Sequence, residues 1–335
     1  MRATLILFAV SAAFGQDVSR VFQLHHIDGE KDQYEFATLV RTIADIPTVL
    51  ADAPKKTLSL SGSASQIATA EFLYTELDRQ TVPDSVSQEY KVANNADDVV
   101  RLFFLPNATT IQSFQEVATT VRTIVEMRRV FTYNALRALA VRGTADQIAA
   151  TAFLVGELDQ PATAKRTDSR EYQMIDTRKM GFTAVRVFYV PYTSTVQQFQ
   201  EVATLVRTIG DIRQVFTYNA PKAITVRGTP DQVALADWLI HELAKPVTAE
   251  TVASQAYTYQ DVNHDGQNII RVFYVKDVPT VSAFQQVATQ IRTATQIRRV
   301  FTYNATMAMA VRGTAAQIAT AEQMLQDRAR QVAAK

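Results

Sequence analysis

The stretch Arg129-Val-Phe-Thr-Tyr-Asn134 recurs twice in the sequence, with Gln in place of Arg in one copy. A second stretch, Ala138-Leu-Ala-Val-Arg-Gly-Thr144, follows it and recurs with it. The other copies are residues 214–219 with 223–229 and residues 299–304 with 308–314. Gly143 and its counterparts Gly228 and Gly313 are therefore 85 residues apart. A fixed internal period of this kind predicts tandem copies of one structural module.

A fainter copy lies upstream, where Leu58-Ser-Leu-Ser-Gly62-Ser63 precedes Gln66. Strand and helix periodicities then alternate in the order β-β-α-β-β-α, and the first copy lacks the leading strand. The sequence thus predicts an α+β fold of four tandem modules, each a small sheet with two helices on one face. We number them 1 to 4, and their expected bounds are residues 16–80, 86–160, 169–245 and 254–332.

Composition and charge exclude several classes of protein. The 335 residues include 34 basic and 33 acidic ones, so the chain lacks the strong positive field expected of a nucleic-acid binder. There is no cysteine, which excludes disulfides, thiolate metal sites and a lipidated cysteine. Residues 1–15 have a charged start, an apolar run and small residues before Gln16, as a signal peptide does. We expect an exported protein without a membrane span after cleavage.

The second helix of every module begins with the same residues. A hydroxyl residue is followed three positions later by Gln, as in Thr144 and Gln147, which is the pattern of a capping box. The Gly before it is expected to supply backbone freedom at the strand-to-helix corner. A phosphate-binding loop would need a Gly-rich run ending in Lys, which is absent.

Candidates for chemistry are few. The segment Asp261–Gly266 begins like a calcium loop, but position twelve is Val272 instead of Glu, so a polar turn is expected. His25 and His26 are adjacent on a strand and point to opposite faces. No histidine recurs between modules. We therefore expect no catalytic residues, no metal site and no cofactor, and a protein that is not an enzyme.

Arginines recur in three rows, which leaves two interpretations open. An anion-binding row is one, and arginine stems that cover apolar surface with their heads in water are the other. The rows lie on the first common strand, the first helix and the last strand: Arg20, Arg101, Arg186 and Arg271; Arg122, Arg207 and Arg292; Arg142, Arg227 and Arg312.

The outer faces of the sheets, turned away from the helices, differ between modules. In modules 2 to 4 they carry aromatic, small and arginine residues, a mixture enriched at interfaces. Module 1 has Gln23, Asp52, Ser59 and Ser61 there, so its face is expected to be solvated. The predicted contact surface, for neighbouring copies or a partner, is Phe104, Tyr133, Arg142, Tyr189, Tyr218, Arg227, Tyr274, Tyr303 and Arg312. Alternatively, these aromatics pack under Tyr90, Tyr172 or Tyr257 of the leading strands.

The order of elements, the Gly-Thr/Ser-x-x-Gln corner and exits such as Leu158-Asp159-Gln160-Pro161 resemble the small N-terminal domains of bacterial secretins. The resemblance implies periplasmic modules that build rings or bind other secretion components. Because the sequence ends at Lys335, soon after the last expected helix, we expect no pore-forming β-domain. The order of elements is also KH-like, but no module has the Gly-x-x-Gly loop that clamps nucleic acid.

The leading hypothesis is therefore an exported, non-enzymatic assembly or adaptor protein of the bacterial envelope that acts through protein–protein contacts. The alternative is a binding module for an anionic envelope polymer that uses the recurring arginines. The sequence predicts protein partners of the cell envelope or self-association, and no nucleic acid.

Overall fold

The computed structural model describes residues 17–81, 88–93, 98–176, 181–247, 253–259 and 268–333. The proposed signal peptide and the candidate calcium loop lie outside these residues. The chain divides into two compact units, Met1–Pro106 with Arg128–Ile148 and Asn107–Met127 with Ala149–Lys335. The division runs through module 2, whose sheet belongs to the first unit and whose helix α3 belongs to the second.

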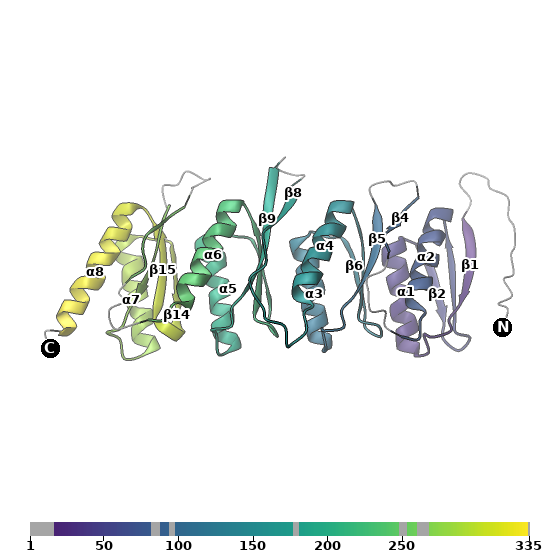
Figure 1. Cartoon of the computed structure of the whole chain (residues 1–335), viewed down its shortest axis with the longest axis horizontal. Helices are drawn as coiled ribbons and strands as arrows, with labels where there is room; N and C mark the ends of the chain where they lie inside the picture. The colour runs from purple at the N-terminus through teal and green to yellow at the C-terminus, as the bar shows by residue number, and fades with distance from the viewer. Residues whose placement is uncertain are drawn as a thin grey trace. The chain divides into compact units, whose positions relative to one another are not determined.

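The first unit contains all of module 1 and the sheet of module 2 (Figure 1). Module 1 has a three-stranded antiparallel sheet in the order β1-β3-β2, and module 2 has a four-stranded sheet in the order β4-β5-β7-β6. The elements of module 1 are β1 (Val18–Gln23), α1 (Glu30–Ala44), β2 (Thr48–Asp52), β3 (Thr57–Gly62) and α2 (Ala64–Leu77). The strands of module 2 are β4 (Tyr90–Lys91), β5 (Val99–Phe104), β6 (Arg129–Tyr133) and β7 (Ala138–Gly143).

The second unit begins with α3 (Ile111–Ile124) and also holds most of α4 (Ala145–Leu158). Modules 3 and 4 follow, with sheets in the orders β8-β9-β11-β10 and β12-β13-β15-β14. Module 3 consists of β8 (Tyr172–Asp176), β9 (Gly181–Tyr189), α5 (Val196–Gly210), β10 (Gln214–Tyr218), β11 (Ala223–Gly228) and α6 (Pro230–Ala244). Module 4 consists of β12 (Tyr257–Thr258), β13 (Ile269–Tyr274), α7 (Val281–Thr295), β14 (Arg299–Tyr303), the short 3-10 helix η1 (Asn304–Thr306), β15 (Ala308–Gly313) and α8 (Ala315–Ala333).

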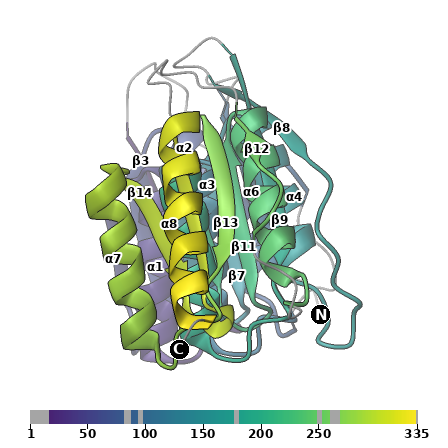
Figure 2. The ribbon, with the colours of Figure 1, turned by 90° about the vertical axis from the view of Figure 1, so that its left-hand side faces the viewer.

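One face of each sheet carries the apolar residues that the strand period assigns to the core. In module 1, Phe22, Leu58 and Leu60 alternate with exposed or half-buried neighbours and pack against helix residues such as Phe36 and Leu73. Figure 2 shows α7 and α8 lying over the sheet of module 4 in the same way. The α+β fold of four modules is confirmed, and among the residues described from position 17 onward the first module has no leading strand.

The capping boxes are also confirmed. Thr229 Oγ1 accepts from the backbone N–H of Gln232 at 3.2 Å, and the Gln232 side chain accepts from the N–H of Thr229 at 3.0 Å. The second helices α2, α4 and α8 begin with the same pair of bonds. The amide of Gln232 also donates to the carbonyl of Asp211 at 2.9 Å, which ties α6 to the end of α5.

The glycine at the strand-to-helix corner is required for a different reason from the one expected. A Cβ on Gly228 would lie 2.7 Å from Oε1 of Gln232, and one on Gly62 would lie 2.7 Å from Oε1 of Gln66. The residue is therefore small because the capping glutamine folds back over it, and the structure gives no sign of a left-handed backbone there.

Candidate functional site: the joints between modules

The predicted contact residues lie where the outer sheet face of one module meets the helices of the preceding module. We call this contact a joint and number three of them: α1 on the sheet of module 2, α3 on that of module 3 and α5 on that of module 4. Figure 1 shows α1 and α2 between the sheet of their own module and that of module 2. Tyr133 is 1% exposed, Tyr218 5% and Tyr303 1%. Burial and nearby carboxylates raise the pKa of Tyr133.

In each joint, a glutamate on the first helix of the preceding module binds an asparagine at the end of the strand on which that helix lies. In joint 2, Glu116 accepts from the backbone N–H of Asn219 at 2.9 Å and from its side-chain amide at 2.7 Å. Glu201 binds Asn304 in joint 3 at 3.0 and 2.7 Å. Glu35 binds Asn134 through the same two groups in joint 1. Each bond is charge-assisted, and its two partners are about 100 residues apart, so the contact fixes the register of helix on strand.

The arginine of the last strand reaches the C-terminal end of the same helix. Nη1 of Arg142 donates to the carbonyl of Ile43 at 3.0 Å, and Arg227 donates to Ile124 at 2.7 Å. Arg312 donates to Ile209 at 3.1 Å. The last carbonyls of a helix have no partner inside it and carry partial negative charge, so a buried guanidinium satisfies and stabilises them.

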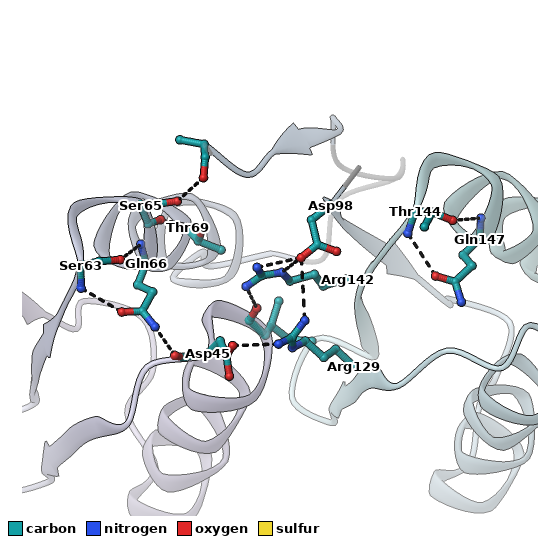
Figure 3. Close-up of polar contacts among 12 residues, drawn as sticks. Asp45, Ser63, Ser65, Gln66, Thr69, Asp98, Arg129, Arg142, Thr144 and Gln147 are labelled. Atoms are coloured by element: carbon teal, nitrogen blue, oxygen red, sulfur yellow. Dashed lines mark hydrogen bonds and ion pairs between the residues drawn. The ribbon is translucent and has the colours of Figure 1, made fainter. Parts of the chain in front are cut away.

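A second polar contact links the helix end to the edge strand β6, β10 or β14 (Figure 3). Arg129 forms an ion pair with Asp45 at 2.8 Å, and Arg299 forms one with Asp211 at 3.2 Å. Both acids are the left-handed residues that end α1 and α5. Joint 2 replaces this ion pair with a hydrogen bond from the uncharged Gln214 amide to the Glu126 carboxylate at 3.0 Å. Beside Arg142 and Asp45 in joint 1 lies a cleft of about 370 Å³.

The leading-strand tyrosines take part in the joints as well. Tyr90 stacks on Phe72 of α2 at 5.0 Å between ring centroids. In joint 2, Tyr172 stacks on Phe153 at 4.8 Å, and in joint 3, Tyr257 contacts Trp238 at 5.0 Å. These tyrosines therefore have partners on the preceding helix.

The sheet aromatics Phe104, Tyr189 and Tyr274 lie in the same joints. Phe104 packs in the apolar cluster that module 1 shares with the sheet of module 2. Tyr189 donates its hydroxyl to the carbonyl of Glu157 at 2.5 Å, and Tyr274 donates to that of Glu242 at 3.2 Å. Burial raises the pKa of Tyr189 to about 12.

The first-strand and helix arginines are engaged within the chain too. Arg20 pairs with Glu71 at 3.0 Å, Arg186 with Asp237 at 3.2 Å and Arg271 with Glu322 at 2.5 Å. Arg207 and Arg292 donate to the carbonyls of the next strand. The guanidinium heads therefore bind carboxylates and carbonyls of the chain.

Among the residues that the structure describes, one group has the composition of a metal site: Asp168, Asp237 and His241. His241 lies between the two carboxylates, 3.3 Å from Asp168 and 3.2 Å from Asp237. Arg186 already neutralises Asp237, and the N–H of Tyr189 donates to Asp168 at 2.8 Å. The group thus holds the segment before module 3 against α6. Within the described ranges, none of the helices is both long and apolar enough to span a bilayer.

The residues predicted to form a contact surface are buried, and sequence reasoning missed the helix residues that cover them. The available signal was the recurrence of Glu35, Glu116 and Glu201 at one position of the first helix, and of Asn134, Asn219 and Asn304 at the end of the strand. A glutamate and an asparagine that both recur with the period of the modules indicate a contact that is repeated between modules.

No protein-family model matches the sequence, and neither does any curated protein. The solved structures to which the chain is similar include three of secretins. ExeD of Aeromonas hydrophila shares 14% identity, with a TM-score of 0.17, over 68% of this chain and 41% of its own length. The N-terminal domain of the secretin XcpQ from Pseudomonas aeruginosa shares 16%, with a TM-score of 0.19, over 43% of this chain and 62% of its own. XcpQN012 shares 15%, with a TM-score of 0.23, over 69% of this chain and all of its own length.

These solved structures are of secretins, the family that the sequence motifs resemble. The chain spans about two fifths of the length of ExeD. At these identities and TM-scores, the similarity carries no conclusion about activity or partners.

Proposed function

We propose that the chain is an exported, non-enzymatic scaffold of the bacterial cell envelope that works through protein–protein contacts. The observation that carries the proposal is the threefold repetition of one joint. Three contacts recur in each joint with matching geometry. A glutamate binds an asparagine, an arginine binds the end of a helix, and a tyrosine ring packs on an aromatic ring. Within each of the two units, such joints hold a helix of one module on the sheet of the next, which suits a protein that positions other proteins.

The recurring residues support the non-enzymatic part of the proposal. A repeated catalytic or ligand site would have to use residues that recur between modules. Those residues are occupied with joining and capping: Arg227 binds a helix end, Glu116 binds Asn219, and Thr229 caps α6. What remains for function is surface that does not recur.

The same contacts weigh against the anionic-polymer alternative. Arg142, Arg227 and Arg312 are at most 9% exposed, and their guanidinium groups bind carbonyls at the joints. A polymer would have to displace these bonds to reach them. The first-strand arginines hold carboxylates of their own or the adjoining segment.

Export and the module bounds belong to the proposal and rest on sequence patterns. We place the mature start at Gln16 and the modules at residues 16–80, 86–160, 169–245 and 254–332. The charged and apolar order of residues 1–15 supports export.

The test is chemical cross-linking of intact cells of the source bacterium, followed by purification of the tagged full chain from the envelope. We expect amino-terminal sequencing to give Gln16 and mass spectrometry to find cross-links to at least one other envelope protein. A cytoplasmic chain with Met1 intact would contradict export. An envelope chain without any protein cross-link that co-purifies with polysaccharide would support the polymer alternative.

A further inference from the structure

The outer face of the first sheet carries a row of side chains across its centre that is apolar at both ends. Val21 pairs with Ser59 in the antiparallel register, and Ser59 pairs with Leu50. Val21 is 62% exposed and Leu50 66% exposed. A sheet face that contacts only water is usually polar, so two exposed branched aliphatic side chains in one row are unexpected there.

The same row exists in the other modules, where it is covered. Leu102, Ala140 and Phe131 form it in module 2, and Leu102 and Ala140 are fully buried. In modules 3 and 4 the rows are Val187-Thr225-Phe216 and Val272-Ala310-Phe301. In each case the cover is the first helix of the preceding module, α1, α3 or α5. In three modules, therefore, this face binds a helix with an aliphatic stripe.

The face of module 1 keeps the apolar row and drops the polar contacts of a joint. Ser61 stands where Arg142 stands in module 2, Asp52 replaces Tyr133, and Ala53 replaces Asn134. A helix that docks here thus needs no glutamate and receives no guanidinium at its carboxyl end. The occupant differs from α1, α3 and α5 in these respects.

A second copy of this chain does not fit as the occupant. The helix that corresponds to α1, α3 and α5 in module 4 is α7, where Gln286 replaces the joint glutamate and Gln290 replaces Leu39, Thr120 or Leu205. On α8, Gln323 stands where Phe72, Phe153 or Trp238 makes the aromatic contact. All three glutamines are exposed. In head-to-tail contact, amides would occupy the positions that aliphatic and aromatic side chains such as Leu39, Leu205 and Phe153 hold in the joints, so α7 and α8 lack the apolar stripe that this row would need.

We infer that the outer face of the first sheet is a docking site for an amphipathic helix of a different protein. The helix lays aliphatic residues spaced three or four apart across the Val21-Ser59-Leu50 row. This inference rests on the proposed scaffold function, and it names the surface and the kind of partner.

The test places a photo-cross-linking amino acid in the full chain, in cells of the source bacterium, at Val21 or Thr48 on this face. Matched control positions are Gln290 and Gln323 on the polar helices of module 4. Cross-linked peptides are identified by mass spectrometry. We expect Val21 and Thr48 to reach one segment of another protein with helical aliphatic spacing. A Leu50→Glu change should abolish the Thr48 cross-link while the circular dichroism spectrum stays unchanged, because Leu50 is exposed.

Three results would overturn the inference. Cross-links from Val21 and Thr48 to a second copy of this chain, to lipid or to an extended segment would name a different occupant. Cross-links that survive Leu50→Glu would show that the row does not bind. Protein cross-links from the control positions alone would remove this face and leave the scaffold function standing. No protein cross-link from any position would count against both.

Discussion

At the scale of single residues, Arg312 is the clearest case of a charge used for structure. The residue is 1% exposed, its Nη1 donates to the carbonyl of Ile209, and its guanidinium lies 4.4 Å from the centre of the Tyr259 ring. Burying a charge is costly unless it is paired and hydrogen-bonded, so the helix end and the ring together keep it in place.

Replacing Arg312 with Met should lower the free energy of unfolding by about 2 kcal/mol or more. The change keeps most of the apolar stem but leaves the buried carbonyl of Ile209 without its donor. Urea denaturation measures the loss. Arg20→Met is the matched control, because Arg20 and Glu71 form an exposed ion pair worth about 0–1 kcal/mol. Equal stability of the two variants would refute the helix-end role.

Tyr189 predicts how the joint responds to alkali. Its burial raises the pKa to about 12, from 10.0 for an ordinary tyrosine. Between these values the unfolded chain loses this proton while the folded chain keeps it. Stability from this group is therefore complete below pH 10 and is lost as the pH rises to about 12, by about 3 kcal/mol, since each pKa unit is worth about 1.4 kcal/mol.

The measurement is denaturation of wild type and Tyr189→Phe at several pH values from 9 to 12. The difference between the two proteins should shrink toward high pH, and ultraviolet difference spectra should lose one late-titrating tyrosine in the variant. A pH-independent difference would contradict the role of the buried hydroxyl.

At the scale of helices and strands, the local signals in the sequence were sufficient. Alternation gave the strands and the capping box gave the helix starts, because both depend on residues within one turn or one pleat. The same locality explains the error at Gly228: its neighbour in space, the Gln232 side chain, is fixed by the helix and not by the turn.

A Thr229→Ala change should cost about 1 kcal/mol in the stability of the full chain, because it removes the acceptor for the Gln232 N–H. Thr229→Ser keeps the hydroxyl and should cost little, as Ser63 caps α2 in the same way. Thermal or urea unfolding of both variants makes the comparison. A serine variant as unstable as the alanine variant would mean that the methyl group, and not the cap, matters.

At the scale of the whole molecule, the sequence predicted which sheet faces carry interface chemistry but not what covers them. Glu116 and Asn219 are 103 positions apart, and no periodicity within either segment refers to the other. A buried face has the same composition whether a helix of the same chain or of another protein lies on it. Only the fold, by bringing α3 onto β10 and α5 onto β14, separates these cases.

The exposed glutamines of α7 and α8 then predict how the chain tolerates shortening. A chain of residues 16–247 ends after α6 and uncovers the face of α5, where Leu205 and Ile209 are fully buried in joint 3. This truncated chain should self-associate, because it exposes an apolar stripe made to receive a sheet. Introducing the module 4 residues at the equivalent positions, as Glu201→Gln, Leu205→Gln and Ile209→Ala, should restore a monomer.

Light scattering after size exclusion distinguishes the two truncated chains, and circular dichroism checks that both fold. The same three changes made in the full chain are the control, and there they should destabilise joint 3 by several kcal/mol, because two buried apolar side chains and a charge-assisted bond are lost. The same substitutions are thus expected to have opposite effects. They should prevent self-association where the face of α5 is uncovered, and they should destabilise the protein where a sheet lies on α5. If the substituted truncation still self-associates, the glutamines of module 4 are not what keeps its helices from receiving another sheet.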